Sequence, residues 1–219
     1  MITNKKAVIF DLDGSLVDSM WIWREIDIEY MNRHGYATTR EELDAFQAEI
    51  EGMSFRETAE WVSSHYGIPR TVEEMMDDWN DMAWDKYEKE VPLKEGVRGF
   101  IEECKKHGIK LGIASSNSRE LVENVLNVHG ILDYFECIKT GSDGLKGKPA
   151  PDIYLTVADL LQVSPADCLV FEDVIKGIQA GKNAGMQVCA VEDAYSAIHR
   201  EEKKKLADYY IEDYYGIWN

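Results

Sequence analysis

The 219-residue sequence predicts an α/β fold in which a parallel sheet is interrupted by an inserted all-helical domain. From residue 92 onward, strand-like apolar runs alternate with helical patterns, as is typical of a parallel sheet covered by helices on both faces. Residues 19–90 show helical patterns and no convincing strand. The run 7–10 precedes this block and is as apolar as the later strands, so we expect it in the same sheet.

The inserted block predicts about four helices. The first runs from residue 18 or 19 to a stop at Gly35, because glycine commonly follows the last turn of a helix. Each of the other three begins with a capping box, in which a hydroxyl and a carboxylate three residues later bond free backbone N–H groups. The boxes are Thr39 with Glu42, Ser54 with Glu57, and Thr71 with Glu74.

The rest of the chain predicts the sheet and its covering helices. We expect helices over 96–107, 118–129, 151–162 and 177–183, and strands over 109–114, 135–139, 168–171, 187–191 and 209–211. The predicted domains are therefore an α/β core of residues 1–15 plus 92–219 and a helical domain of residues 16–91.

Composition excludes several classes of function. The net charge of -17 disfavours binding to nucleic acid or to an anionic membrane surface. Four cysteines without a Cys-x-x-Cys pair indicate buried thiols in a reducing compartment. The N-terminus does not resemble a signal peptide, and no run approaches the roughly 20 apolar residues of a membrane span. We expect a cytoplasmic monomer or weak dimer that acts on a small molecule.

Two carboxylates, Asp11 and Asp13, follow the first predicted strand, and Gly14 then permits a sharp turn. Side chains two residues apart on an extended backbone point the same way, so these carboxylates repel each other. Such a pair is favoured where a cation neutralises it, or where one carboxylate attacks a substrate and the other transfers protons.

Other polar residues follow the later strands of the predicted sheet. Ligands of open parallel sheets bind at the carboxyl ends of the strands, so these residues should lie together with the carboxylate pair. Carboxylate oxygens suit Mg²⁺, and a lysine, hydroxyls and backbone N–H groups suit phosphate. The predicted site comprises Asp11, Asp13, Ser115, Ser116, Lys148, Glu172 and Asp173.

With these residues the chain resembles the haloacid dehalogenase superfamily of phosphotransferases. Four motifs occur in the family's order, each at a predicted strand end or loop. They are Phe-Asp-Leu-Asp-Gly-Ser-Leu-Val-Asp-Ser at 10–19, Ala-Ser-Ser at 114–116, Lys-Pro-Ala-Pro-Asp at 148–152, and Phe-Glu-Asp at 171–173 followed by Gly-Ile-Gln-Ala at 177–180. A helical cap between the first two motifs is similar to the subfamily of β-phosphoglucomutase and many sugar-phosphate phosphatases. The resemblance implies a Rossmann-like core.

The resemblance also implies a role for each site residue. Asp11 would be the nucleophile that forms an aspartyl-phosphate, and Asp13 the general acid and base. Mg²⁺ would be held by Asp11, the backbone carbonyl of Asp13 and Asp173, with Glu172 nearby, directly or through water. Ser115, Ser116 and Lys148 would hold the phosphate.

Within the family, this sequence favours a phosphatase acting on a small phosphorylated metabolite such as a sugar phosphate. Asp13 disfavours a dehalogenase, and the lack of lysine between Lys6 and Lys86 disfavours a phosphonatase. A β-phosphoglucomutase typically has a histidine where this chain has Trp23. A mutase remains the alternative, and a catalytically silent binding or regulatory protein of the same fold is the alternative outside enzymes.

Substrate contacts from the cap are predicted at Trp23, Arg24 and Arg56. The competing interpretation of the tryptophan is that it packs in the cap core. Hinges for cap movement are expected at 15–19 and 90–94, and closure of a cap excludes water from the site.

Overall fold

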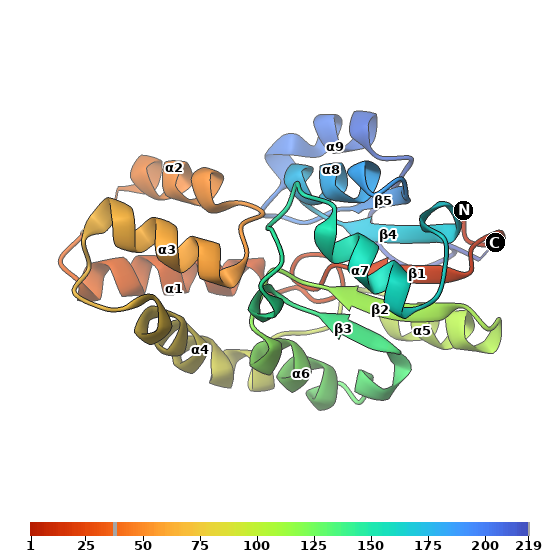
Figure 1. Cartoon of the computed structure of the whole chain (residues 1–219), viewed down its shortest axis with the longest axis horizontal. Coiled ribbons are helices and arrows are strands. Elements are labelled where there is room, and N and C mark those ends of the chain that lie inside the picture. Colours follow the sequence, from red (N-terminus) through yellow and green to blue (C-terminus); the bar gives the residue numbers. More distant parts are fainter. Residues whose placement is uncertain (37–38, 219) are drawn as a thin grey trace.

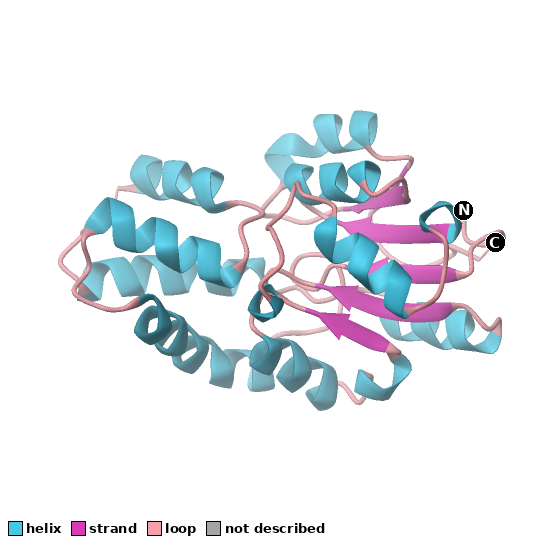
Figure 2. Cartoon of the chain, viewed as in Figure 1, coloured by secondary structure: helices cyan, strands magenta, loops and turns pink. Residues whose placement is uncertain are grey.

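A computed structural model describes residues 1–36 and 39–218 and confirms the α/β fold with an inserted helical cap. The sheet has six parallel strands in the order β3-β2-β1-β4-β5-β6 (Figures 1 and 2). The strands are β1 (Ala7–Phe10), β2 (Lys110–Ala114), β3 (Cys137–Lys139), β4 (Cys168–Glu172), β5 (Gln187–Val191) and β6 (Tyr209–Ile211).

Among the described core residues, five α-helices pack around this sheet, one before β2 and one in each connection from β2 to β6 (Figure 1). One face carries α5, whose Phe100 packs on the rings of Phe10 and Phe171. The opposite face carries α7 and α8, with Tyr154 and Ile178 in its buried cluster. The helices are α5 (Val97–Lys106), α6 (Arg119–Val128), α7 (Asp152–Leu160), α8 (Ile175–Asn183) and α9 (Arg200–Leu206).

In its described residues, the inserted cap has four helices, which lie beyond the carboxyl ends of the strands (Figure 1). All three predicted capping boxes are present at the starts of α2, α3 and α4. Aromatic packing joins the helices, for example the edge-to-face contacts of Phe55 with Trp23 and Trp79. The cap helices are α1 (Met20–Arg33), α2 (Arg40–Ile50), α3 (Phe55–Tyr66) and α4 (Val72–Lys89).

The two chain segments that join core and cap run beside each other. The Asp18 N–H donates to the Pro92 carbonyl at 3.0 Å, and the Lys94 N–H donates to the Leu16 carbonyl at 3.0 Å. The cap also touches the core where α3 begins, because the Phe55 N–H donates to the Ser116 carbonyl at 2.9 Å. The cap is thus held against the strand ends by backbone bonds, in a closed arrangement.

Helix α9 is absent from the sequence-based prediction. Its residues, Arg-Glu-Glu-Lys-Lys-Lys-Leu, are almost all charged and lack an apolar period. Nevertheless, Lys203 in this helix is fully buried and packs beside the end of β5. The sequence pattern therefore gives no signal for this helix, although one of its lysines is part of the interior.

Candidate active site

The carboxyl ends of the central strands and the inner surface of the cap enclose a cavity of about 180 Å³. The core supplies one end of this cavity with residues that follow β1, β2, β3 and β4. They include Asp11, Asp13, Ser116, Asn117, Lys148 and Asp173. The structure therefore brings together, at one edge of the sheet, residues that are up to 162 positions apart, as the predicted strand ends require.

Asp11 follows β1 and is held in place by its backbone and its side chain. Its N–H donates to the Phe171 carbonyl at 3.0 Å, which continues the pairing of β1 with β4. Lys148 reaches it from the loop before α7, with Nζ 2.6 Å from Asp11 Oδ1 and 2.5 Å from Glu172 Oε1. Lys148 thus bridges two carboxylates that lie close together on adjacent strands and would otherwise repel each other.

Glu172, the last residue of β4, is fully buried and has both carboxylate oxygens engaged. Oε1 accepts hydrogen bonds from Lys148 and from the Tyr154 hydroxyl, the latter at 2.7 Å. Oε2 accepts from the Asp173 N–H at 3.0 Å. Because its oxygens are already bonded, Glu172 orients Lys148 and the backbone of Asp173 from behind the cavity.

Asp13 lies on the opposite side of Asp11 and is surrounded by donors. Ser19 Oγ donates to Oδ1 at 2.6 Å, and Asn117 Nδ2 donates to Oδ2 at 3.0 Å. The hydroxyl of Tyr87, from cap helix α4, also donates to Oδ1. Tyr87 in turn accepts from Trp23 Nε1 at 2.8 Å, so a hydrogen-bond chain connects two cap helices to the carboxylate of the core.

Asp173 carries the clearest sign of a missing partner. Ser15 Oγ donates to its Oδ1 at 3.2 Å, but its buried Oδ2 has no hydrogen-bond partner among the described residues. Burial, followed by the charges of neighbouring carboxylates, raises the pKa of Asp173 well above its ordinary value. A side chain at Gly14 would collide with this oxygen, since an added Cβ would lie 2.3 Å from Oδ2. The space in front of Asp173 is thus kept open.

These features fit a divalent cation. Carboxylate oxygens of Asp11, Glu172 and Asp173 lie within 4.8 Å of one another, all buried. Burial also raises the pKa of Asp11 to about 8, although the charge of Lys148 opposes the shift. A group of carboxylates that is unfavourable in its charged form, with one oxygen unpartnered, is what a hard cation would stabilise.

The two predicted serines occupy different places. Ser116 lines the cavity beside Lys148. Ser115 is buried just below, where its Oγ accepts from the Asn117 N–H at 3.1 Å, and it borders a smaller recess that it shares with Lys148 and Gly147. The predicted hydroxyl pair therefore borders the lysine from two sides.

Of the three cap residues predicted to contact substrate, one lines the cavity and two do not. Trp23 lines the cavity. Arg24 turns sideways to Asp44, at 2.8 Å, and Arg56 pairs with Glu73 at 3.0 Å on the cap surface; neither is among the cavity-lining residues. The two arginines lie where carboxylates on neighbouring helices draw them away from the cavity.

Sequence reasoning missed several residues that the structure brings to the site. Tyr87 and Asn117 hold Asp13, and Asp27, Gln47 and Tyr195 line the cavity. Asn117 had a signal, because it directly follows the predicted serine pair at a strand end. The others lie on helix faces or in a loop far from any motif, and only the docking of the cap places them.

The comparison with protein families agrees with this site. Residues 8–191 match the family described as haloacid dehalogenase-like hydrolase. The chain therefore belongs to this family, within the group that carries a helical cap after the first strand. It is a phosphoric monoester hydrolase of the phosphatase type.

The chain is also similar in sequence to individual members of the family. It is 35% identical to β-phosphoglucomutase of Bacillus subtilis, over 83% of this chain and 80% of that protein. It is 29% identical to hexitol phosphatase B of Escherichia coli K12, over 84% and 82%. The bifunctional riboflavin kinase/FMN phosphatase of Arabidopsis thaliana is 33% identical over 84% of this chain, which spans only 48% of that longer protein.

Among solved structures, CbbY from Rhodobacter sphaeroides in complex with phosphate aligns with a TM-score of 0.83. The two chains are 25% identical, and the alignment covers 96% of this chain and 95% of that one. Within the described residues, no helix is both long and apolar enough to cross a membrane.

Proposed function

We propose that the protein is a Mg²⁺-dependent phosphatase that hydrolyses a small phosphorylated metabolite, a sugar phosphate, through an aspartyl-phosphate on Asp11. The observation that carries this proposal is the composition of the core end of the cavity. There a nucleophilic carboxylate, a bridging lysine and an unpartnered carboxylate oxygen meet in a space of metabolite size. The relatives named as phosphatases support the same reaction.

In the first step, a carboxylate oxygen of Asp11 attacks phosphorus while the bond to the leaving oxygen breaks. Asp13 gives its proton to that oxygen, which leaves as a hydroxyl group. In the second step, Asp13 takes a proton from water, whose oxygen forms the new bond to phosphorus as the bond to Asp11 breaks. The hydrogen bonds from Ser19, Tyr87 and Asn117 keep the Asp13 carboxyl directed at the cavity.

Charge neutralisation would come from the cation and the lysine. Asp11, the Asp13 carbonyl and Asp173 would hold Mg²⁺, with Glu172 behind them or joined through water. When bound, the ion would offset the negative charge of the phosphoryl oxygens and of the carboxylates. Lys148, Ser115 and Ser116 would bind the remaining phosphoryl oxygens.

Phosphate release from a panel of sugar and nucleotide phosphates tests this function. We expect release that requires Mg²⁺, that stops with EDTA and that returns when Mg²⁺ is restored. Turnover that is unaffected by EDTA would contradict the metal assignment. No release from any substrate, p-nitrophenyl phosphate included, would instead favour the silent binding protein.

A phosphosugar mutase is the second candidate, supported by the identity to β-phosphoglucomutase. Against it, Arg56 pairs with Glu73 outside the cavity, and no lysine or arginine among the described cap residues lines the cavity to bind a second phosphate. Product analysis with β-glucose 1-phosphate separates the two candidates. A phosphatase gives glucose and phosphate, whereas a mutase gives glucose 6-phosphate.

The domain boundaries are also proposed, with a core of 1–15 plus 92–219 and a cap of 16–91. The adjacent segments that join α1 and α4 to the core support them, because both cross between the domains at one place. We further propose a cytoplasmic location, supported by four free cysteines, and a monomer or weak dimer. Limited proteolysis tests the boundaries, and sedimentation tests the oligomeric state.

A further inference from the structure

We propose that the cap end of the cavity binds the neutral, hydroxyl-bearing end of a sugar or polyol monophosphate and rejects substrates that carry a second phosphate. This inference rests on the proposed function, since it concerns the part of the substrate that lies beyond the reacting phosphate. It concerns a group of four cavity-lining residues, Asp27, Gln47, Glu51 and Tyr195, called here the distal wall.

The ionisable side chains that line the cavity are mainly acidic. Among the described residues that line it, Lys148 is the only lysine or arginine, and its ammonium group is already bonded to Asp11 and Glu172. The distal wall contributes two carboxyl groups, of Asp27 and Glu51. Burial raises the pKa of both, which shows that the surroundings already disfavour negative charge there.

The positive groups near the distal wall already have partners. Arg24 donates to Gln47 Oε1 at 2.9 Å but pairs outside the cavity with Asp44. Lys176 lies near Glu51, and its ammonium donates to the Glu49 carbonyl at 3.5 Å; His199 is a more distant neighbour. Neither Lys176 nor His199 is among the residues that line the cavity.

Hydrogen-bonding groups of the distal wall match hydroxyls. Gln47 Nε2 donates to Asp27 Oδ2 at 3.1 Å, which orients an amide and a carboxyl side by side. Burial, followed by the nearby charges of Glu51 and Asp27, raises the pKa of Tyr195, so its hydroxyl stays protonated and can donate. Acceptors and a donor are thus presented together, as a chain of neutral hydroxyls requires.

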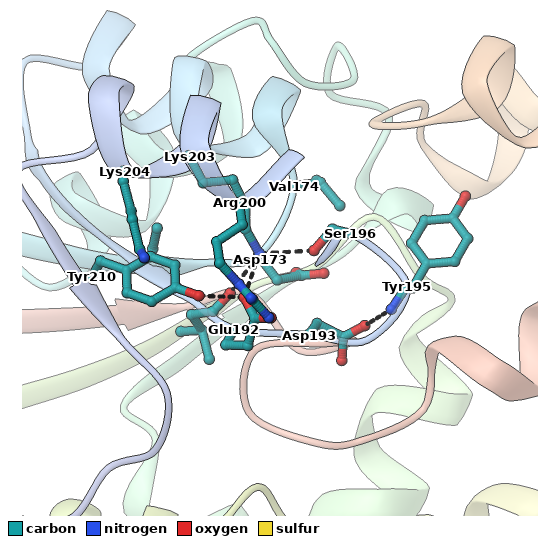
Figure 3. A network of polar contacts seen from close by, with 12 residues as sticks. Asp173, Val174, Glu192, Asp193, Tyr195, Ser196, Arg200, Lys203, Lys204 and Tyr210 are labelled. Carbon is teal, nitrogen blue, oxygen red and sulfur yellow. Dashed lines mark hydrogen bonds and ion pairs between the residues drawn. The ribbon is translucent and has the colours of Figure 1, made fainter. Parts of the chain in front are cut away.

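Tyr195 reaches the cavity from a loop that the core holds firmly. In Figure 3 its side chain extends away from a polar network at the end of β5. Its N–H donates to Asp193 Oδ1 at 2.8 Å, and Asp193 pairs with Lys94 at 2.6 Å. The buried Lys203 donates to Ser196 Oγ and to the Val191 carbonyl, each at 2.9 Å. The distal wall therefore joins a fixed core loop to cap helices.

The opposite side of the cavity is aromatic, with Trp23, Phe55 and Trp79. Such rings suit the C–H face of a sugar or polyol and offer nothing to an anion. A second phosphate would therefore lie against two carboxyl groups without a free cation. Loss of its hydration shell in a site that offers no free cation opposes the binding of a second phosphate strongly.

Matched substrate pairs test the inference. We expect kcat/KM for fructose 6-phosphate to exceed that for fructose 1,6-bisphosphate by about 100-fold or more, and glucose 1-phosphate to exceed glucose 1,6-bisphosphate similarly. Glu51→Lys should raise kcat/KM for the bisphosphates and reduce the ratio by about 10-fold. Glu51→Gln, which changes less volume, should shift the ratio in the same direction.

Glu49→Lys is the matched control, because it makes the same change of charge two residues away, at an exposed position in the last turn of α2. It should leave the ratio unchanged. Equal use of mono- and bisphosphates by the unaltered protein would overturn the inference, as would an equal shift in Glu49→Lys, or no shift in either Glu51 variant. A preference of more than about tenfold for glucosamine 6-phosphate over glucose 6-phosphate would also overturn it, since the wall would then select a cation.

Hydrolysis of p-nitrophenyl phosphate by the same preparation distinguishes a failure of the distal-wall assignment from a failure of the proposed function. If the dye substrate is hydrolysed but the ratio is near one, only the distal-wall assignment fails. If no phosphate is released from any compound, the proposed function fails.

Discussion

The two ends of the cavity differ in how their residues are held. At the core end, Asp11, Lys148 and Glu172 are buried. Lys148 bonds to both carboxylates, which follow or end the adjacent parallel strands β1 and β4. At the cap end, Asp27 lies on α1 and Glu51 directly follows α2, and they meet Tyr195 only because the cap is docked on the core. The core end therefore has one arrangement imposed by the sheet, whereas the arrangement of the cap end depends on domain closure.

This difference assigns separate tasks to the two ends. The core end carries the groups for bond making and breaking, and any substrate must present its phosphate there. The cap end contacts the rest of the substrate. Substitutions in the core should therefore affect every substrate equally, whereas those in the cap should affect substrates unequally. The following substitutions test this separation.

The largest effect is expected for Asp11→Asn. Loss of the attacking carboxylate should reduce kcat by about 10⁴-fold or more on every phosphate ester, because no other group of the site replaces a nucleophile. Initial rates of phosphate release measure this. The control is Asp18→Asn, an exposed residue of the same segment, which should keep full activity. Substantial Mg²⁺-dependent turnover by Asp11→Asn would refute the role of Asp11.

A smaller but still general effect is expected for Gly14→Ala. Its Cβ would lie 2.3 Å from Asp173 Oδ2, and its φ of 79° is strained for alanine. We expect weaker Mg²⁺ activation and a loss of activity of about 100-fold. Gly185→Ala, with a φ of 74° and open space around it, carries similar strain without the collision and should retain activity. Equal losses in both variants would show that strain alone is responsible.

Tyr87→Phe tests the contact between the two ends. It removes a hydrogen bond to Asp13 and an acceptor for Trp23, so kcat should fall by about tenfold, the effect of one buried hydrogen bond. Steady-state kinetics would detect this, with KM for p-nitrophenyl phosphate changing less than kcat. The exposed Tyr215→Phe is the control. An unchanged kcat would show that the cap does not orient Asp13.

The smallest effect concerns stability. The pKa of Asp27 is raised by burial from 3.8 to about 7, so the folded protein retains a proton that the unfolded chain has lost between these values. The free energy of unfolding should therefore fall as pH rises from about 4 to about 7. Asp27→Asn should remove this fall, and at pH 8 it should be more stable by about 1 kcal/mol, since the side chain is partly exposed and solvent screening lowers the cost of its charge.

Urea unfolding at pH 5 and pH 8 measures this change, with the exposed Glu29→Gln as control on the same helix. A stability difference at pH 8 that is no larger than in the control would contradict the burial of charge at Asp27.

The separation of the two ends also explains what the sequence could predict. The core end comes from short motifs at strand ends, where an apolar run fixes the strand and the next residues must lie at the sheet edge; this placed Asp11, Lys148 and Asp173 together. The helical cap was predicted because apolar periods and capping boxes are local signals. These features depend on residues that are only a few positions apart in the sequence.

The cap end was not predictable in this way. Tyr87 is an ordinary tyrosine of an amphipathic helix until the cap docks and its hydroxyl meets Asp13. Arg24 and Arg56 are plausible substrate ligands in sequence, but Asp44 and Glu73 on neighbouring helices draw them outward. Lys203 lies in a charged segment and is buried only because the end of β5 offers a carbonyl to its ammonium group. Long-range packing decides each of these positions.

The central claim is that the core end acts through a phosphorylated Asp11. Rapid quenching during turnover, followed by borohydride reduction, converts an aspartyl-phosphate into homoserine, which mass spectrometry of the peptide can locate. We predict homoserine at position 11 only, dependent on substrate and absent in Asp11→Asn. Homoserine at position 13 or elsewhere, or no modified residue while phosphate is released in a burst, would contradict the account.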